Sequence, residues 1–209
     1  MKNNSMNLQM FGGWEALKET PQNNNNKTEF TKLQNGITEL RFLDAEPFVR
    51  WAHWIAQAKR NISCLGTDCP VCEAVKASKQ AGIKPQYSSN RKFAMHVLNL
   101  TTGNVEVLEQ GKTFFTQLHA LHEEMGDIRG YNIKVKTQNA GSTDVTYTLI
   151  PCTPSDLTDE QQELCKDLKP FEDIFKKPTR EQVIQLMDGK SPEEVFSNKS
   201  SEEDETIGL

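Results

Sequence analysis

Three cysteines within nine residues constrain this chain more than any other feature of its sequence. Cys64, Cys69 and Cys72 follow the spacing C-x4-C-x2-C, and His53 precedes the first of them by eleven positions. The CPVC segment at 69–72 has the form of a knuckle, in which a tight turn brings two thiolates to one metal ion. Zinc favours four tetrahedral nitrogen and sulfur ligands, and three cysteines with one histidine are a standard structural set. We therefore predict one structural Zn2+ bound by His53, Cys64, Cys69 and Cys72.

Two other interpretations of these cysteines have less support from the sequence. A redox-active CxxC pair would follow a strand and begin a helix in a βαβ unit, and the neighbouring sequence does not have that form. A disulfide framework is disfavoured because the chain has five cysteines and no secretory signal precedes them, so we expect a reducing compartment. The fourth ligand stays open between His53 and His96.

Alternating apolar and polar residues predict a mainly β (α+β) fold. The expected strands are 37–43, 91–100, 105–108, 131–137 and 143–150. Apolar residues at helical spacing predict a helix over 112–125, while 48–60 is interpreted as a helix or irregular turn and 73–80 as a short helix. Five strands with a helix between the third and fourth is the order of a five-stranded OB-fold barrel. The zinc-binding insertion would lie between its first and second strands, although other small α+β folds share this count.

Composition divides the chain into four parts. They are a flexible N-terminal arm (1–27), an OB-fold core (28–152) with a zinc subdomain at about 48–80, a helical extension packed on the core (153–196) and a disordered acidic tail (197–209). The extension is predicted from capping-box sequences that start at Thr158, Thr179 and Ser191. The tail carries four consecutive acids at 202–205 and has no apolar periodicity. Nothing in the sequence resembles a membrane span.

Charge is distributed unevenly along the chain. The net charge is −5, but residues 27–100 hold 11 basic and 6 acidic side chains, which gives +5. Residues 151–209 hold 7 basic and 15 acidic side chains, which gives −8. A basic middle with an acidic end is the pattern expected when a polyanion binds the middle and the tail serves another purpose.

Cations and aromatic side chains are interleaved around the predicted metal site. Single-stranded nucleic acid binds to grooves that combine phosphate-binding cations with aromatic faces on which bases stack. The candidate DNA-binding residues are Arg41, Trp51, Trp54, Lys59, Arg60, Tyr87, Arg91, Lys92, Phe93, Lys134 and Lys136. Strand alternation places Lys134 and Lys136 on one open face, which makes them the clearest cations of the set. Core packing of the aromatic residues and simple solvation of the lysines are the competing interpretation.

These residues give the chain a resemblance to a known family. It resembles the helix-destabilising, single-stranded DNA-binding proteins of tailed bacteriophages, of the phage T4 type, over about residues 30–152. The matching segments are LRFLDAEPF (40–48), the histidine with its CPVC knuckle, RKFAMHVLNL (91–100) and GNVEVLEQGKTFF (103–115). The most specific of them is the histidine followed by a cysteine and CPxC, inserted after the first strand.

The resemblance implies a non-enzymatic function. It implies a zinc-bearing OB-fold that binds single-stranded DNA without sequence preference and melts and protects it during phage replication, recombination and repair. The acidic tail would recruit a polymerase, helicase or helicase loader. The protein would act in the cytoplasm of the infected bacterium and would not bind membranes. Two features depart from the family. The spacing between Cys64 and the CxxC is short, and the only basic residues within 1–20 are Lys2 and Lys18. Cooperative binding through the arm is therefore not predicted, and the oligomeric state stays open.

Two other functions compete with this prediction. A zinc hydrolase or nuclease would need an open coordination position and a general base, but four ligands are present and the sequence has no HExxH motif. A zinc-ribbon regulator that binds RNA or a polymerase would instead prefer structured RNA or protein over oligo-dT.

Overall fold

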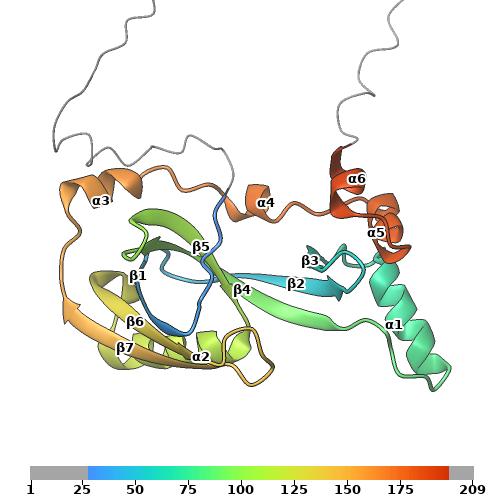
Figure 1. The fold of residues 1–209 in the computed structure, drawn as a ribbon, viewed down its shortest axis with the longest axis horizontal. Coiled ribbons are helices and arrows are strands. Elements are labelled where there is room, and N and C mark those ends of the chain that lie inside the picture. The colour runs from blue at the N-terminus through green and yellow to red at the C-terminus, as the bar shows by residue number, and fades with distance from the viewer. Residues whose placement is uncertain (1–27, 198–209) are drawn as a thin grey trace, which may run out of the picture.

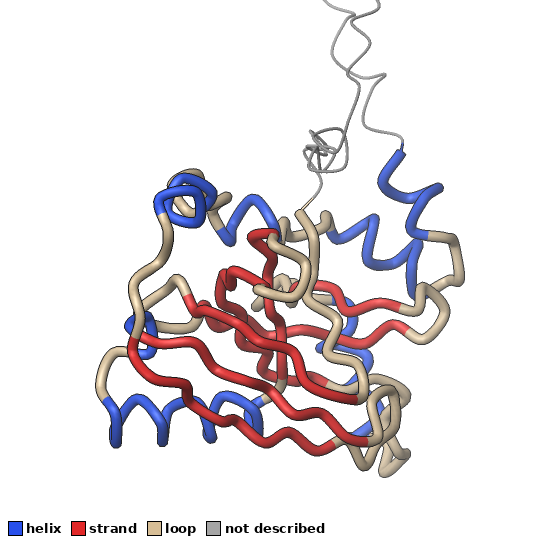
Figure 2. Tube along the Cα trace, turned by 60° about the vertical axis from the view of Figure 1, so that its left-hand side comes forward, coloured by secondary structure: helices blue, strands red, loops and turns tan. Residues whose placement is uncertain are grey.

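The computed structural model describes residues 28–197, which form an α+β fold around one open antiparallel sheet (Figures 1 and 2). The predicted arm (1–27) and residues 198–209 of the predicted tail lie outside the described residues. The strands are β1 (Gly36–Phe42), β2 (Phe48–Ile55), β3 (Arg60–Ser63), β4 (Ser89–Asn99), β5 (Asn104–Gln110), β6 (Tyr131–Gln138) and β7 (Thr146–Pro154). The helices are α1 (Pro70–Gln80), α2 (Lys112–Met125), η2 (Ile128–Gly130), α3 (Asp159–Leu164), α4 (Phe171–Ile174), α5 (Arg180–Met187) and α6 (Pro192–Ser197). Within 28–197, no helix is long and apolar enough to cross a membrane.

The sheet is organised around β4. β1 and β2 follow each other along one edge of β4, where Arg41 faces Leu98 and Phe48 faces Ala94. β5 pairs with the opposite edge of β4, β6 pairs with β1, and β7 pairs with β6. No ladder joins β5 to β7 in the part of the chain that the structure describes, so the sheet is open and does not close into a barrel.

The expected strands are confirmed as β1, β4, β5, β6 and β7, with α2 between β5 and β6, but the sheet has seven strands. The prediction of a helix or irregular turn at 48–60 was wrong, because this segment forms β2 and the start of β3. Both faces of β2 carry a mixture of buried and exposed residues. Its sequence therefore lacks the alternation of apolar and polar residues that would have predicted a strand.

A first core lies between the sheet and α2. Leu40 and Phe42 of β1 and Val97 of β4 pack with Phe114 and Leu118 of α2, and all five are almost fully buried. Each such side chain contributes about 1.5–3 kcal/mol relative to an exposed position. We call the side of the sheet that faces α2 the inner face, and the opposite side the outer face.

A second core lies at the other end of the molecule, where α1, α5 and α6 gather beside β3 (Figure 1). Ile55 of β2, Ile62 of β3 and Val71 of α1 pack there against Val183 and Leu186 of α5. The C-terminal helices thus complete the core of the hairpin that carries the predicted metal ligands. The three predicted capping boxes are present, each with both of its hydrogen bonds, at Thr158, Thr179 and Ser191.

Between these two regions, residues 155–175 form a strap across the outer face. The ring of Phe171 stacks on His96 of β4 at 4.1 Å and on Phe48 of β2 at 5.1 Å, measured between ring centroids. Ser155, at the start of the strap, accepts hydrogen bonds from Arg41 of β1. The part of the outer face around Arg41 of β1 and His96 of β4 is therefore covered by the chain itself.

His96 fastens this strap, and it makes stability depend on pH. Its Nδ1 lies 3.1 Å from an Asp44 carboxylate oxygen and its Nε2 lies 3.0 Å from the Lys169 carbonyl oxygen. Burial alone would lower the pKa of His96, but Asp44 and the Lys169 carbonyl raise it above its ordinary value. Both partners are acceptors, so both ring nitrogens donate only when the imidazole is protonated.

We expect the His96→Gln substitution to cost more stability at acidic pH than at alkaline pH. The stabilisation from a raised pKa is complete below the unfolded value of about 6.5 and is lost as pH rises through the folded value. Urea unfolding of both proteins at pH 5.5 and 8.5 measures the difference, and His122→Gln, an exposed position, is the control. An equal cost at both pH values would contradict a charged His96.

Candidate metal centre

The hairpin of β2 and β3, together with the start of α1, brings the four predicted ligands together. His53 lies in β2, Cys64 directly follows β3, Cys69 is the N-cap of α1 and Cys72 lies in its first turn. The backbone N–H of Cys64 donates to the Trp51 carbonyl oxygen at 2.9 Å, which continues the hairpin ladder to the first cysteine.

Backbone geometry then turns the chain from the hairpin into α1. Gly66 has a φ of +91°, in a region that side chains with a Cβ rarely adopt. Pro70 occupies the start of α1, where its missing N–H removes no helical hydrogen bond. The knuckle predicted from the sequence therefore forms at the helix N-terminus.

The ligand atoms have the spacing of a tetrahedral metal site. Cys64 Sγ and Cys72 Sγ are 3.6 Å apart, and His53 Nε2 lies 3.4 Å from Cys69 Sγ and 3.5 Å from Cys72 Sγ. All four atoms lie within 4.8 Å of one another. Tetrahedral zinc, with Zn–S bonds of about 2.3 Å and Zn–N bonds of about 2.1 Å, spaces its sulfurs by about 3.8 Å and a nitrogen–sulfur pair by about 3.6 Å. The cluster can therefore hold a metal ion such as zinc.

Hydrogen bonding selects which nitrogen of His53 faces the cluster. The His53 side chain is fully buried, and its Nδ1 lies 3.2 Å from the Ser88 carbonyl oxygen. Nδ1 then carries the proton, and the lone pair of Nε2 faces the space between the ligand atoms, where a metal ion would bind. Burial lowers the pKa of His53, which favours this neutral form. His96, the rival fourth ligand, is instead bonded to Asp44 and Lys169.

The pKa values of the cysteine thiols indicate that three thiolates need a nearby positive charge. Burial raises the pKa of Cys72 to about 12, and the nearby Cys64 and Cys69 add to this shift. For Cys69, burial opposes ionisation, but hydrogen bonds from the backbone N–H groups of Leu65, Cys72 and Val71 lower its pKa. Three thiolates in this space need a compensating positive charge, which a divalent metal provides when it binds. Four protein ligands complete a tetrahedron and leave no position for a substrate, as in structural sites.

The predicted DNA-binding residues fall on two sides of the sheet. Register pairs Trp51 with Arg91, and alternation places both on the inner face, beyond the part that α2 covers. The Arg91 guanidinium carbon lies 5.5 Å from the centre of the Trp51 ring, and 52% of Trp51 is exposed. His53, two residues further along β2, is on the same face, so Trp51 adjoins the metal centre.

Lys134 and Lys136 lie on the outer face. They pair across the sheet with Glu39 and Ile37 of β1, while the intervening Val135 is fully buried in the first core. The prediction that the two lysines share an open face is confirmed, since both are exposed. Their face is nevertheless the one opposite to Trp51. The Lys134 ammonium is also 3.9 Å from the Glu39 carboxylate.

Arg41 does not have the accessibility that a DNA contact requires. It is only 3% exposed, because its guanidinium donates to Asn132 Oδ1, to the Arg129 carbonyl, and to the carbonyl and hydroxyl oxygens of Ser155. We correct its prediction accordingly: Arg41 joins β1 to η2, β6 and the strap.

The other predicted residues are dispersed around β2 and β4. Trp54 is 46% exposed but points to the outer face, opposite to Trp51. Lys59 is exposed in the turn before β3, and Arg60 lies over the Phe196 ring. Half-buried Lys92 is on the outer face. Phe93 and Tyr87 are half-buried and pack against the first and second cores, respectively.

Two contributors to the site were missed by the sequence analysis. Ser88 orients the histidine through its carbonyl oxygen, and Arg180 of α5 donates to Asp68 and Glu73 beside the ligands Cys69 and Cys72. A backbone carbonyl leaves no signature in a sequence. Arg180 is separated by more than a hundred residues from its partners, so only the folded chain shows the contact.

The fold and site define an α+β protein with a Cys3His cluster that can hold a metal ion. No protein-family model matches the chain, and no curated protein matches it either. The resemblance to phage single-stranded DNA-binding proteins therefore depends on the motif residues alone.

Proposed function

We propose that this protein binds single-stranded DNA without sequence preference, at the inner-face surface formed by Trp51 and Arg91. The observation that carries the proposal is a half-exposed tryptophan with a guanidinium beside its ring, two residues from a metal ligand. Base stacking on an aromatic side chain and phosphate binding by a cation are the two requirements for such binding. The bound metal would be Zn2+, with a structural role.

The position of Trp51 supports a binding role over a packing role. Val49, the next inner-face residue along β2, is also 48% exposed, so an apolar strip continues beyond the first core. Arg91 approaches the tryptophan ring without an ion-pair partner among residues 28–197. A pairing of cation and aromatic ring that is open to solvent suits a ligand with anionic and planar aromatic groups.

Strand order supports the same proposal. The five strands β1, β4, β5, β6 and β7, with α2 between β5 and β6, follow the chain order of an OB-fold. We propose that the fold is an open OB-type sheet, in which β2, β3 and α1 are the metal-bearing insertion. In this proposal the protein protects and melts single strands in phage replication, recombination and repair, and residues 197–209 recruit a polymerase, helicase or helicase loader.

Titration of metal-loaded protein with oligo-dT tests the proposal, with tryptophan fluorescence as the readout for the wild type and anisotropy of end-labelled oligo-dT as the readout for the tryptophan variants. We expect salt-reversible quenching, and the Trp51→Ala substitution should weaken binding by about 1–3 kcal/mol, or about 5- to 150-fold. Trp54→Ala is the matched control, because Trp54 is similarly exposed in the same strand but faces the other way.

The outcomes separate the candidate functions. Equal losses in the two tryptophan variants would argue against the inner-face site. If the metal-loaded protein does not bind oligo-dT but binds structured RNA or a polymerase, the result would favour a zinc-ribbon regulator. Cleavage of phosphodiesters that scales with bound metal would favour a nuclease.

A further inference from the structure

We propose that the bound DNA strand continues from Trp51 past the metal centre onto α1, where Lys76 and Lys79 bind its phosphates. This inference rests on the proposed function and adds a second subsite to it. In this inference the metal-bearing insertion also binds DNA directly, because α1 would present two cations to the phosphates.

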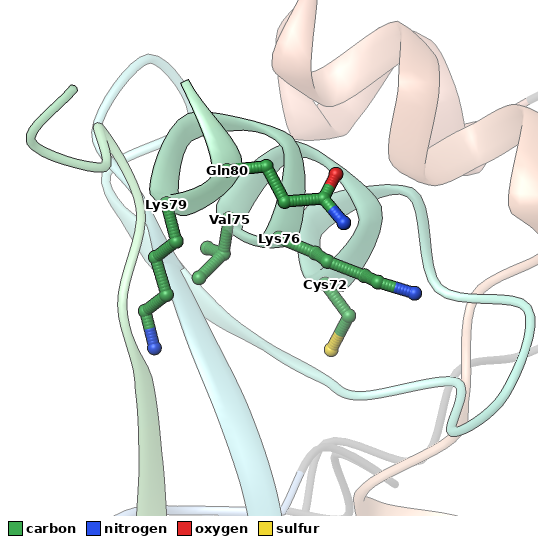
Figure 3. Close-up of a pocket in the computed structure, with 5 residues that line it drawn as sticks. All are labelled: Cys72, Val75, Lys76, Lys79 and Gln80. Atoms are coloured by element: carbon green, nitrogen blue, oxygen red, sulfur yellow. The ribbon is translucent and has the colours of Figure 1, made fainter. Parts of the chain in front are cut away.

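A pocket on α1 is the first observation. It has a volume of about 450 Å³, and Figure 3 shows its lining residues on one side of the helix, with Cys72, Val75 and Lys79 pointing the same way. The lining is completed by Lys76 and Gln80. These residues recur at three- and four-residue intervals, which places them along a single helix face. The apolar floor and cationic rim suit a sugar-phosphate backbone.

The metal centre connects this pocket to Trp51. The Trp51 carbonyl oxygen accepts the backbone N–H of Cys64 at 2.9 Å. Cys64 Sγ is 3.6 Å from Cys72 Sγ, and Cys72 lines the pocket. Trp51 and the pocket therefore both adjoin the ligand cluster, since Cys72 Sγ also lies 3.5 Å from His53 Nε2 and His53 shares the inner face with Trp51. In the proposal, a single extended strand that passes the cluster contacts both.

Charge is separated around α1. Glu73, the acid in its first turn, and Asp68 both pair with Arg180, at 2.7 and 2.9 Å, on the side of α5. Lys76 and Lys79 are exposed and form no ion pair in the part of the chain that the structure describes. A divalent ion with three thiolates and a neutral imidazole carries a formal charge of −1, and together with Asp68, Glu73, Arg180 and the two lysines the local charges sum to zero. Because Arg180 pairs with both acids, Lys76 and Lys79 are the cations that this helix offers to phosphates.

The test compares two pairs of lysines that lie on different surfaces. Full-length, metal-loaded Lys76→Ala/Lys79→Ala and Lys134→Ala/Lys136→Ala remove the same charge, so their effects on long-range attraction match. Each is titrated with oligo-dT of about 12 nucleotides, within the 4–16 that one OB-fold covers, between about 50 and 200 mM salt. Alanine is a strong helix former, so the α1 variant should keep its fold.

We expect only the α1 pair to change the salt dependence. Loss of two phosphate contacts lowers the slope of log K against log salt by about 1.4 for a single strand. Wild-type affinity should then fall about sevenfold further than that of the α1 variant over this salt range. Quenching of tryptophan fluorescence at saturation should persist, because Trp51 is unchanged.

Three results would overturn the proposal in different ways. An unchanged slope in the α1 variant, with wild-type binding intact, would remove the second subsite and leave the proposed function standing. A changed slope in the Lys134 and Lys136 variant alone would place the strand on the outer face. Absence of oligo-dT binding by the wild-type protein would refute both the proposed function and this subsite.

Discussion

Replacement of Cys69 by serine is expected to unfold the end of the molecule that carries the metal centre. Cys69 is fully buried, and its loss removes one of four ligands. Structural zinc sites contribute apparent binding free energies of about 10–16 kcal/mol in small domains. Whole domains are stable by only about 5–15 kcal/mol, so the second core should not survive the loss of its metal.

The second core is too small to compensate. Its buried residues include Ile55 and Ile62 from the hairpin and Val183 from α5, in a cluster smaller than the first core. Cores of this size usually depend on a metal or a disulfide. Because α5 packs on this cluster, we expect loss of metal to release the C-terminal helices as well as α1.

Hydrogen exchange measured by mass spectrometry would locate the unfolding. Protection should fall in β2, β3, α1 and α5 of Cys69→Ser, and the bound metal per chain should fall with it, while β6 stays protected by the first core. Cys152→Ser is the matched control, since Cys152 lies in β7 and outside the ligand cluster. Wild-type melting temperature and metal content in Cys69→Ser would refute the metal centre.

Local sequence was sufficient for most of the metal centre. Cys64, Cys69 and Cys72 lie within nine residues, so their spacing already limits how far apart the sulfurs can be. The choice between His53 and His96 was not decidable in this way. It depends on the Ser88 carbonyl behind one ring and on Asp44 beside the other, and both are tertiary contacts.

Sequence alternation predicted the faces of single strands but not how those faces combine. Lys134 and Lys136 share a face, as the sequence predicted. Trp51 and Arg91 also share a face, which the sequence did not predict. Only the register of β1 with β6, and of β2 with β4, shows that these pairs lie on opposite sides of the sheet. The seven-stranded sheet was missed for a related reason, since β2 has no uniformly buried face for a sequence pattern to report.

Arg41 shows how a cation in a strand can be misassigned. The sequence makes Arg41 a candidate DNA contact, but the strap and η2 cover its side chain and accept its hydrogen bonds. The acceptors come from residues about ninety or more positions away in the chain. No local pattern could have revealed them.

The Arg41→Met substitution is expected to destabilise the fold by about 3 kcal/mol, because it removes the hydrogen bonds from the buried guanidinium to the Arg129 and Ser155 carbonyl oxygens, and hydrogen bonds that involve a charged group are worth about 1.5–3 kcal/mol each. Chemical denaturation measures this loss, and the salt dependence of oligo-dT binding by the folded fraction should not change. Arg129→Ala is the control, since its ion pair with Asp127 is about half exposed and surface ion pairs contribute little to stability. Unchanged stability combined with a reduced salt slope would instead return Arg41 to the DNA-binding surface. Destabilisation without a change in slope would leave Arg41 as the residue that ties the strap to the sheet, and would keep DNA contacts on the side of Trp51.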